Sequence, residues 1–585
     1  MTSTAQIRVA ADAAAPLPRS AVSPVHAGML ARHTPLDLHL GAAVKATLVA
    51  AGAAIPATAD AVAQLWSRHL KFDAADPRWP DRDRFLVQPT VGGALLSVLL
   101  RLTGHDAPSE AAGSLAHPAC ELPTETSGQA FGCAVGMALA ERLLTARFGR
   151  SLVDHRTWLV ASGHDLASGA GHAAGSLAGQ LRLEKLTVLW HDEDTSDERL
   201  RRFAGYGWAT RAVDAHDNSA LAAALAMAVR SRKPTLIACR VASARLLTEV
   251  AADLDAMSDS VAVMLQSAGR RGVTARRGWL KRLARHPQRP EFERTMTDRL
   301  PDGLHEVLGN LKAEWSERRD LRSTRDASEA VVEALLPILP ELAGAGPPGD
   351  AGLHEGALAA VGGLAAHGGL VPHGSGPLAH AHASRAAMRL SGDLQRRAVH
   401  VFDEAGCHED MAVVAGMRAM LNLAVFRPAD AIEVVECWDL ALRRAEGPSL
   451  MLLSTIPVPP RRAEIAENCC ARGGYVVAEA SGARQATLLA SGPEVAASLA
   501  ARAMLEGEGI TVAVISMACW ELFEQTDPAY RAQVLGTAPR VAVEFGCEFG
   551  WERWLGERAA KVGRGLSPDT LAAAVAAAVR RLVAT

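Results

Sequence analysis

The stretch Asp76-Pro77-Arg78-Trp79-Pro80-Asp81-Arg82-Asp83-Arg84-Phe85 opens a series of short segments that together decide the fold. Their order along the chain carries the evidence, since any one of them alone is a weak signal. The first half of the chain continues the series at residues 102–105, 134–141, 176–179, 203–208 and 215–217. The second half adds residues 339–341, 366–369, 427–430, 471–476 and 527–531.

The ordered series resembles that of the transketolase family, from about residue 40 to the C-terminus. The resemblance implies three domains and a homodimer with a large interface between the first two domains. It also implies that thiamine diphosphate binds between two subunits. The diphosphate and a divalent metal would lie on the first domain, and the aminopyrimidine ring on the second.

Strand-like and helix-like segments alternate along the chain. Alternation predicts parallel sheets, because parallel neighbours need crossover helices that cover both faces. The expected fold class is therefore α/β, with three domains, each a mostly parallel sheet flanked by helices. The expected strands are residues 157–161, 186–190, 235–239, 398–402, 449–453, 487–490, 511–516 and 540–544.

Changes of composition predict the domain boundaries. Residues 1–38 are rich in Ala, Pro and Ser without a sustained period, as in a flexible extension. Residues 267–324 are strongly charged, as in a solvated helical connector. The expected parts are a pyrophosphate-type domain at 39–266, a pyrimidine-type domain at 325–456, and a linker with the C-terminal domain at 457–585.

Bulk composition excludes several classes of protein. The 585 residues include 49% hydrophobic and 21% charged residues with a formal net charge of −3, which indicates a soluble protein that does not bind nucleic acid. The nine cysteines never form a C-x-x-C pair, which favours reduced thiols in a cytoplasmic protein. Neither a leader segment nor an apolar stretch of about 18 residues is evident, so we expect no membrane association.

The first-domain motifs of the family are mostly replaced. The resemblance expects Gly-Asp-Gly as the metal loop, and this chain has Ser162-Gly163-His164 instead. The family Asn after the next strand falls in His191-Asp192-Glu193-Asp194, and the segment that follows is shortened. Asp165 and Glu193 are candidate cofactor residues, together with His117, because His117-Pro118 matches a family Gly-His-Pro. A solvated acidic turn is the alternative interpretation, and we predict no metal site here.

Family histidines that contact the cofactor or substrate are replaced as well. Residues 50–53 and 89–93 supply alanine and valine side chains where the resemblance expects histidines. Such side chains neither donate hydrogen bonds nor shuttle protons.

In the second domain, the decisive family glutamate aligns with His354, and Glu355 lies one residue away. Glu355 would take the place of the family glutamate only if the loop slipped by one residue. The aromatic residue that stacks on the pyrimidine aligns with Pro377, which removes the stacking surface.

Some of the residues with which the family binds its substrate are retained. By the resemblance, His408 matches an active-site histidine and Arg325 a phosphate-binding arginine, whereas a second arginine has become Thr455. Another local group, His367, His373, His380 and His382, has no recognised ligand spacing, so packed or surface histidines are the expectation.

The leading hypothesis is a transketolase-like protein without normal thiamine diphosphate and magnesium chemistry, which acts by binding. Its partner would be a second copy, and pairing with a genuine transketolase subunit is a further possibility. The alternative is an active transketolase that moves a two-carbon ketol unit between sugar phosphates and depends on thiamine diphosphate and Mg²⁺. In that case His354 or Glu355 with His408 would be catalytic, Arg325 would bind phosphate, and Asp165 or Asp192 would hold the metal.

Overall fold

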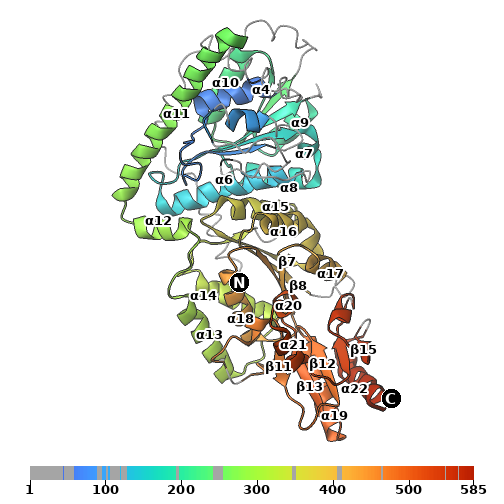
Figure 1. Ribbon diagram of the computed structural model, residues 1–585. Coiled ribbons are helices and arrows are strands. Elements are labelled where there is room, and N and C mark those ends of the chain that lie inside the picture. The colour runs from blue at the N-terminus through green and yellow to red at the C-terminus, as the bar shows by residue number, and fades with distance from the viewer. Residues whose placement is uncertain are drawn as a thin grey trace. The chain divides into compact units, whose positions relative to one another are not determined.

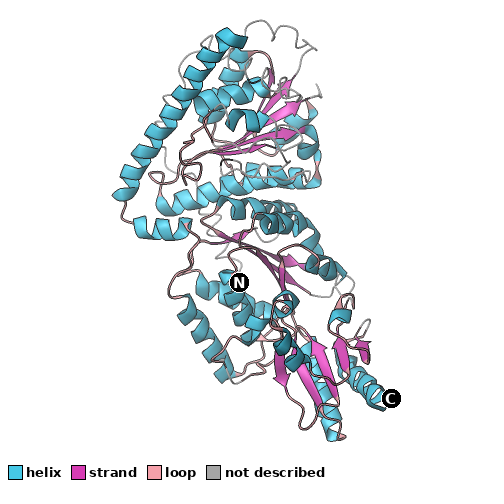
Figure 2. Ribbon diagram, viewed as in Figure 1, coloured by secondary structure: helices cyan, strands magenta, loops and turns pink. Residues whose placement is uncertain are grey.

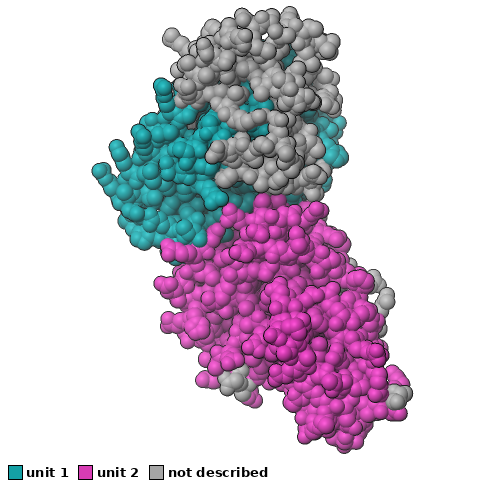
Figure 3. Space-filling view, viewed as in Figure 1, with its two compact units in different colours: residues 1, 3–297, 345–370 teal, residues 2, 298–344, 371–585 magenta. Residues whose placement is uncertain are grey.

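The computed structural model forms two compact units, which are coloured separately in Figure 3. Unit 1 takes residues 3–297 and 345–370, and unit 2 takes residues 298–344 and 371–585. The extension expected at 1–38 lies outside the described residues. Those are residue 44 and residues 58–87, 95–100, 103–105, 119, 121, 128–192, 197–240, 254–345, 351–404, 412–462, 465–546, 548–563 and 566–584.

Unit 1 contains a five-stranded parallel sheet in the order β1-β2-β3-β5-β4. Helices α4 and α10 lie on one face, and α6 and α8 on the other (Figure 1). Trp158, Val160 and Ile237 pack with Trp66 in one core cluster, because alternate residues of a strand point to the same face. The strands are β1 (Arg84–Val87), β2 (Thr157–Ser162), β3 (Leu186–Asp192), β4 (Ala209–Asp214) and β5 (Thr235–Arg240).

The helices of unit 1 include a long charged helix, α11, that runs along one side of the unit (Figure 1). The part of the chain from 267 to 324 is largely helical, but Trp279, Phe292 and Trp315 bury their rings. Unit 1 contains α4 (Ala59–Gln64), the π-helical turn Leu65–His69, α6 (Gln129–Phe148), α7 (Gly163–Ala167), α8 (Gly169–Gln180), α9 (Glu198–Gly205), α10 (Asn218–Arg230), α11 (Leu254–Ala284), α12 (Arg289–Met296) and α15 (Ala351–His367).

Glycines allow α15 to approach α6 at backbone distance. A Cβ added at Gly363 would collide with the Cys133 carbonyl, and one added at Gly136 would collide with the Ala360 carbonyl. Only residues without a side chain permit this separation, so both helices depend on glycine where they cross.

Unit 2 contains two further five-stranded sheets (Figure 2). Their orders are β6-β7-β8-β10-β9 and β11-β13-β12-β14-β15. The β11 strand alone runs antiparallel to its neighbour among the pairs described for the second of these sheets. The strands are β6 (Leu342–Ala345), β7 (Val371–Pro377), β8 (Ala398–Asp403), β9 (Ala424–Phe426), β10 (Pro448–Leu453), β11 (Tyr475–Ala478), β12 (Ala486–Ala490), β13 (Val512–Ser516), β14 (Arg540–Val543) and β15 (Ala559–Val562).

The predicted fold class is confirmed, because three mostly parallel sheets are flanked by helices. Each strand expected from the sequence is present, with ends displaced by one or two residues at most. No helix among the described residues is both long and apolar enough to cross a membrane. The helices of unit 2 are α13 (Leu304–Arg318), α14 (Thr324–Leu335), α16 (Ala381–Asp393), α17 (Ala412–Arg418), α18 (Ala431–Arg443), α19 (Glu494–Gly507), α20 (Trp520–Glu524), α21 (Pro528–Leu535), α22 (Pro568–Ala584) and the 3-10 turns Leu378–His380, Cys469–Arg472 and Trp551–Arg553.

One buried arginine joins three segments of unit 2. The Arg427 guanidinium donates to Glu404 at 2.8 Å, to Glu494 at 2.8 Å and to Glu544 at 3.0 Å. Arg427 and Glu494 are completely buried. Burial alone would disfavour the charge, yet the three carboxylates hold the pKa of Arg427 above its ordinary value. Arg427 therefore donates to all three carboxylates and links their segments.

Candidate functional site

The carboxyl ends of β2 and β3 meet at one edge of the unit 1 sheet. Both strands are parallel, and Ser162 at the end of β2 pairs with His191 near the end of β3. Ligands of parallel sheets bind beyond the carboxyl ends of the strands. This edge is therefore a candidate ligand site, and it carries the Ser162-Gly163-His164 triplet.

Asp165, a candidate cofactor residue, is completely buried at this edge. One carboxylate oxygen accepts from the Gly128 backbone at 3.0 Å. The other accepts from the Ser162 backbone at 3.2 Å and from the Ser162 hydroxyl at 2.9 Å. Together with the bond from the Asp165 backbone to the Ser162 hydroxyl, these contacts cap α7. The Asp165 carboxylate thus already accepts three hydrogen bonds from Gly128 and Ser162.

Gly163 leaves room for a guanidinium. A Cβ added at Gly163 would lie 2.5 Å from the Arg199 Nη1 and 3.4 Å from the Trp190 Nε1. Arg199 is on α9, and its guanidinium carbon lies over the Trp190 ring, 5.2 Å from the centroid. Trp190 is completely buried on β3, and its indole N–H has no hydrogen-bond partner among the described residues. Two donors therefore converge where the resemblance expects a carboxylate.

Further positive charge lies beside Arg199. The Arg202 guanidinium contacts the His172 Nε2 at 3.0 Å and donates to Glu198 at 2.7 Å. Partial burial, with the charges of Arg202 and Arg199, lowers the pKa of His172. The lowered pKa leaves His172 uncharged, and the Arg202 charge is paired with Glu198.

These residues do not fit the divalent cation that the resemblance implies. Magnesium prefers carboxylate, carbonyl and water oxygens, whereas Trp190 and Arg199 offer only N–H donors. Within the described ranges, no group of three or more His, Cys, Asp or Glu side chains is placed to hold a metal ion. The same donors do suit the oxygens of an anion.

The other candidate residues lie in both units or outside the described residues. Arg325 lies at the start of α14 in unit 2, where its guanidinium is 3.9 Å from Asp403 and 3.6 Å from Glu329. His354 and Glu355 lie on α15 in unit 1, with their backbone alone described. His117, Glu193 and His408 lie outside the described residues, and so does the Asp192 side chain.

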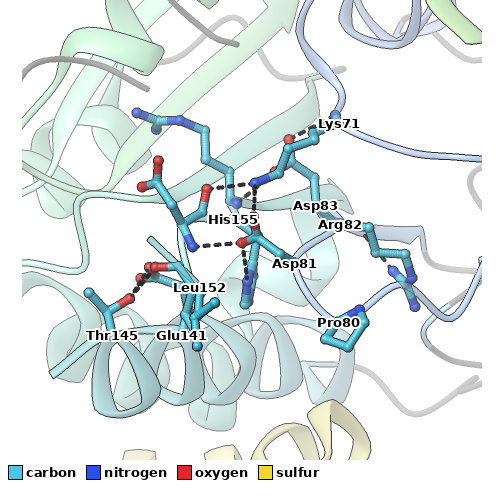
Figure 4. Close-up of polar contacts among 12 residues, drawn as sticks. Lys71, Pro80, Asp81, Arg82, Asp83, Glu141, Thr145, Leu152 and His155 are labelled. Carbon is cyan, nitrogen blue, oxygen red and sulfur yellow. Dashed lines mark hydrogen bonds and ion pairs between the residues drawn. The ribbon is translucent and has the colours of Figure 1, made fainter. Parts of the chain in front are cut away.

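The Asp81-Arg82-Asp83-Arg84 motif forms a buried ionic network in unit 1 (Figure 4). Lys71 Nζ donates to Asp81 at 2.9 Å, and Asp81 also accepts from the Asp154 backbone at 2.6 Å. Asp83 accepts from the Arg156 backbone at 2.8 Å. The motif therefore links the start of β1 to the segment before β2, so its role is structural.

Two neutral histidines stack inside this network. His155 and His367 are buried with ring centroids 5.0 Å apart, and their Nε2 atoms are 2.9 Å apart. The His367 Nδ1–H donates to the Gly368 carbonyl at 2.8 Å, so the His367 Nε2 accepts from His155. Burial, with the nearby Arg84 charge, lowers the pKa of both histidines well below 6.5.

This pair predicts a loss of stability in acid. The unfolded chain takes up protons on these histidines as pH falls below 6.5, while the folded chain does not, so acid favours unfolding. Each proton contributes about 1.4 kcal/mol per pH unit. We expect His155→Gln to flatten the pH dependence of unfolding by up to this amount between roughly pH 6 and 4.5.

Urea unfolding of both proteins across this pH range measures the difference in slope. His164→Gln is the matched control, because the His164 ring is exposed, and its slope should equal that of the parent protein. Equal slopes for the parent protein and His155→Gln would contradict the prediction.

The remaining histidines of the 367–382 group are spread over different environments. His373 is buried and stacks edge-on with Trp438, whereas His382 is exposed.

Sequence reasoning missed Arg199 and Trp190. The signal available was the shortened segment after β3, which brings α9 close to the end of that strand in the sequence.

Comparisons with known proteins agree with the fold. The family described as "Transketolase, thiamine diphosphate binding domain" matches residues 38–244, its pyrimidine binding domain matches residues 349–460, and the "Transketolase-like TK C-terminal domain" matches residues 473–565. The chain is 35% identical to the transketolase of Sinorhizobium medicae, covering 86% of this chain and 85% of that one.

Two further comparisons extend this result. A transketolase of Rhodobacter capsulatus is 33% identical over 86% of this chain and 88% of its own length. The solved transketolase of Leishmania mexicana superposes with a TM-score of 0.80 at 25% identity, covering 96% of this chain and 98% of that chain. With three matched domains in family order and this identity over most of its length, the chain belongs to the transketolase family.

Proposed function

We propose that this member of the family acts by binding, without magnesium-dependent ketol transfer. The observation that supports the proposal is the guanidinium of Arg199 beside Gly163, where the resemblance expects a metal-liganding carboxylate. Function depends on the residues of a site and not on the fold that carries it. A site with donors in place of carboxylates has lost the means to hold the cation.

The sequence of the second domain supports the same proposal. The position of the family glutamate is His354, and that of the stacking aromatic residue is Pro377 at the end of β7. A misplaced general acid typically costs about 10²–10⁴-fold in rate. Self-association as a homodimer and pairing with a transketolase subunit remain predictions of the resemblance. The domain boundaries remain a prediction from composition.

A second candidate is an active transketolase dependent on thiamine diphosphate and Mg²⁺. The comparisons favour it more directly, since the relatives are named transketolase and the first matched domain is described as thiamine diphosphate binding. Glu355, His408 and Arg325 would then act in a remodelled site. This candidate requires a cation site made by residues other than Gly163 and the occupied Asp165 carboxylate.

A ketol-transfer assay separates the two candidates. Xylulose 5-phosphate and ribose 5-phosphate are supplied with thiamine diphosphate and Mg²⁺, and the Sinorhizobium medicae relative is assayed in parallel. We expect turnover at least about a thousandfold below that of the relative, since a site without its acid–base group and cation loses two separate contributions. Turnover that requires both cofactors would establish the second candidate instead.

A further inference from the structure

The second half of α11 and the residues after it carry an unbalanced positive charge. Residues 270–289 contain eight Lys or Arg residues and neither Asp nor Glu, although the whole chain has a formal net charge of −3. Helices in which the two charges alternate neutralise themselves through pairs three or four residues apart, and this stretch has no such pairs. Its charge is therefore balanced by other parts of unit 1, by salt or by a partner.

One face of α11 is fixed to unit 1, along the side of which the helix runs (Figure 1). Trp279 is buried, and its indole N–H donates to the Leu152 carbonyl at 2.8 Å. The Arg276 guanidinium lies 2.6 Å from Asp76. The cations on this side of the helix thus have partners, and they hold α11 against the segment that precedes β2.

A row of four cations lies on the opposite face. At 3.6 residues per turn, its members fall within about 80° of the helix circumference, on the side away from Trp279. None of them forms a hydrogen bond or an ion pair with any residue that the structure describes. This basic row consists of the exposed residues Arg270, Arg277 and Lys281 on α11 and Arg285 directly after its end.

The helix dipole does not account for the basic row. Cations in the last turn of a helix are stabilised by its negative end, which explains Lys281 and Arg282. The dipole amounts to about half an elementary charge, and its effect is confined to the last turn. Arg270 and Arg277 lie further from that end, so most of the charge of the row stays unbalanced within the protein.

The surroundings of the row favour a protein partner. Nucleic acid responds to the charge of the whole protein, and this chain has a formal net charge of −3. Helices that bind membrane surfaces present a broad apolar face to the lipid. In the described part of α11, Leu280 is the one exposed large apolar side chain, because residues such as Trp279 and Leu283 are buried.

The spacing of the row indicates what kind of segment fits it. Arg277, Lys281 and Arg285 follow one another at intervals of four residues, or about 6 Å along the helix axis. Glutamates four residues apart on another helix have the same spacing, so successive carboxylates would meet successive cations. Leu280 lies beside the row and adds an apolar contact, as protein interfaces combine apolar and charged contacts.

We propose that the basic row docks an acidic helix of another protein, one that carries carboxylates at every fourth residue. The row lies on α11, and no residue of the candidate site at the end of β2 belongs to it. The inference therefore does not depend on the proposed function, and it applies equally to an active transketolase.

Fluorescence anisotropy of a labelled peptide, titrated with the full chain at low salt, tests the proposal. The probe is a stapled alanine helix with glutamate at every fourth position. We expect saturable binding that weakens as salt is added, because salt screens exposed charges. A stapled peptide of the same composition, with its glutamates spread around the helix, should bind at least about threefold more weakly, since fewer ion pairs form at once.

Substitutions in the row locate the binding surface. Arg277→Gln combined with Lys281→Gln should weaken binding of the aligned peptide at least about fivefold, because two ion pairs are lost. Arg232→Gln combined with Lys233→Gln is the matched control, since it removes one exposed Arg and one exposed Lys after α10. The control variant should bind as the parent protein does, and both variants should keep the thermal midpoint of the parent protein.

Charge reversal gives a second, independent readout. Arg277→Glu combined with Lys281→Glu should no longer bind the glutamate peptide and should bind the matching lysine peptide instead. A variant that merely perturbs the fold would gain no affinity for lysine.

Several results would overturn the inference. These are no peptide binding, equal affinity for the aligned and the spread peptide, or equal affinity of the parent protein and the row variant. Tighter binding of single-stranded RNA or of vesicles rich in phosphatidylserine would show that the partner belongs to another class. If the row substitutions dissociate a homodimer in sedimentation, the row is an interface between copies of this chain, and the proposed partner is wrong.

Discussion

Arg427→Met should destabilise unit 2 by about 3–5 kcal/mol, because it removes the cation that binds the buried carboxylates of Glu494 and Glu544 and the half-buried Glu404. Glu494 is completely buried, and its carboxylate receives the Arg427 Nη2 at 2.8 Å and the Phe545 backbone N–H at 3.0 Å. Methionine replaces the volume of the arginine stem but none of its donors. Urea unfolding followed by circular dichroism at neutral pH measures the loss.

The stability lost on Arg427→Met should be smaller in mild acid. Burial already raises the pKa of Glu494 well above its ordinary value, and removal of the guanidinium would raise it further. A carboxyl whose folded-state pKa is raised gains its proton as pH falls, so the variant recovers stability below neutrality relative to the parent protein. Glu494→Gln in the Arg427→Met background should restore part of the loss at neutral pH.

The matched control is Arg580→Met. Arg580 and Glu508 form an exposed ion pair at 2.6 Å, and exposed pairs contribute little. Its unfolding midpoint should equal that of the parent protein. A midpoint for Arg427→Met as high as that of the control would contradict the view that one buried cation holds this cluster together.

Gly363→Ala should destabilise unit 1 by about 1–3 kcal/mol or more, although alanine is the better helix former. The new Cβ would collide with the backbone of Cys133, which has no flexible end to move aside. Relief requires α15 and α6 to separate, which exposes the apolar contact between them. Thermal unfolding of unit 1 measures the change.

The same substitution in open space should have the opposite sign. Gly269 lies within α11, and a Cβ added there meets no atom within 4 Å. Gly269→Ala should therefore stabilise the helix by about 0.5–1 kcal/mol. Equal effects at the two positions would show that helix propensity, and not the close approach of α15 to α6, determines the result.

Local patterns predicted the strands well because each strand carries its own signal. The run at β12 and the run at β13 are short, apolar and rich in β-branched or aliphatic residues, and both are fully buried. Such runs bounded by helical stretches indicate parallel strands whatever their partners are. The runs themselves do not give the order of the strands in each sheet, which depends on contacts between distant segments.

Long-range contacts explain what sequence reasoning missed. Gly136 and Gly363 are ordinary helical glycines in the sequence, and only the crossing of α6 with α15 gives them a role. Arg199 has no motif of its own, and its meaning depends on the absent side chain at Gly163 and on the ring of Trp190. Sequence alone showed that a carboxylate was missing, but not what had filled its place.

The proposed function requires that the end of β2 carries anion donors and no divalent cation. Electron paramagnetic resonance of Mn²⁺, titrated into the full chain with thiamine diphosphate, tests it most directly, because bound Mn²⁺ loses its free-ion signal. We predict the same free-ion signal as in a solution of Mn²⁺ and coenzyme without protein. Stoichiometric loss of that signal on adding the protein would contradict the account.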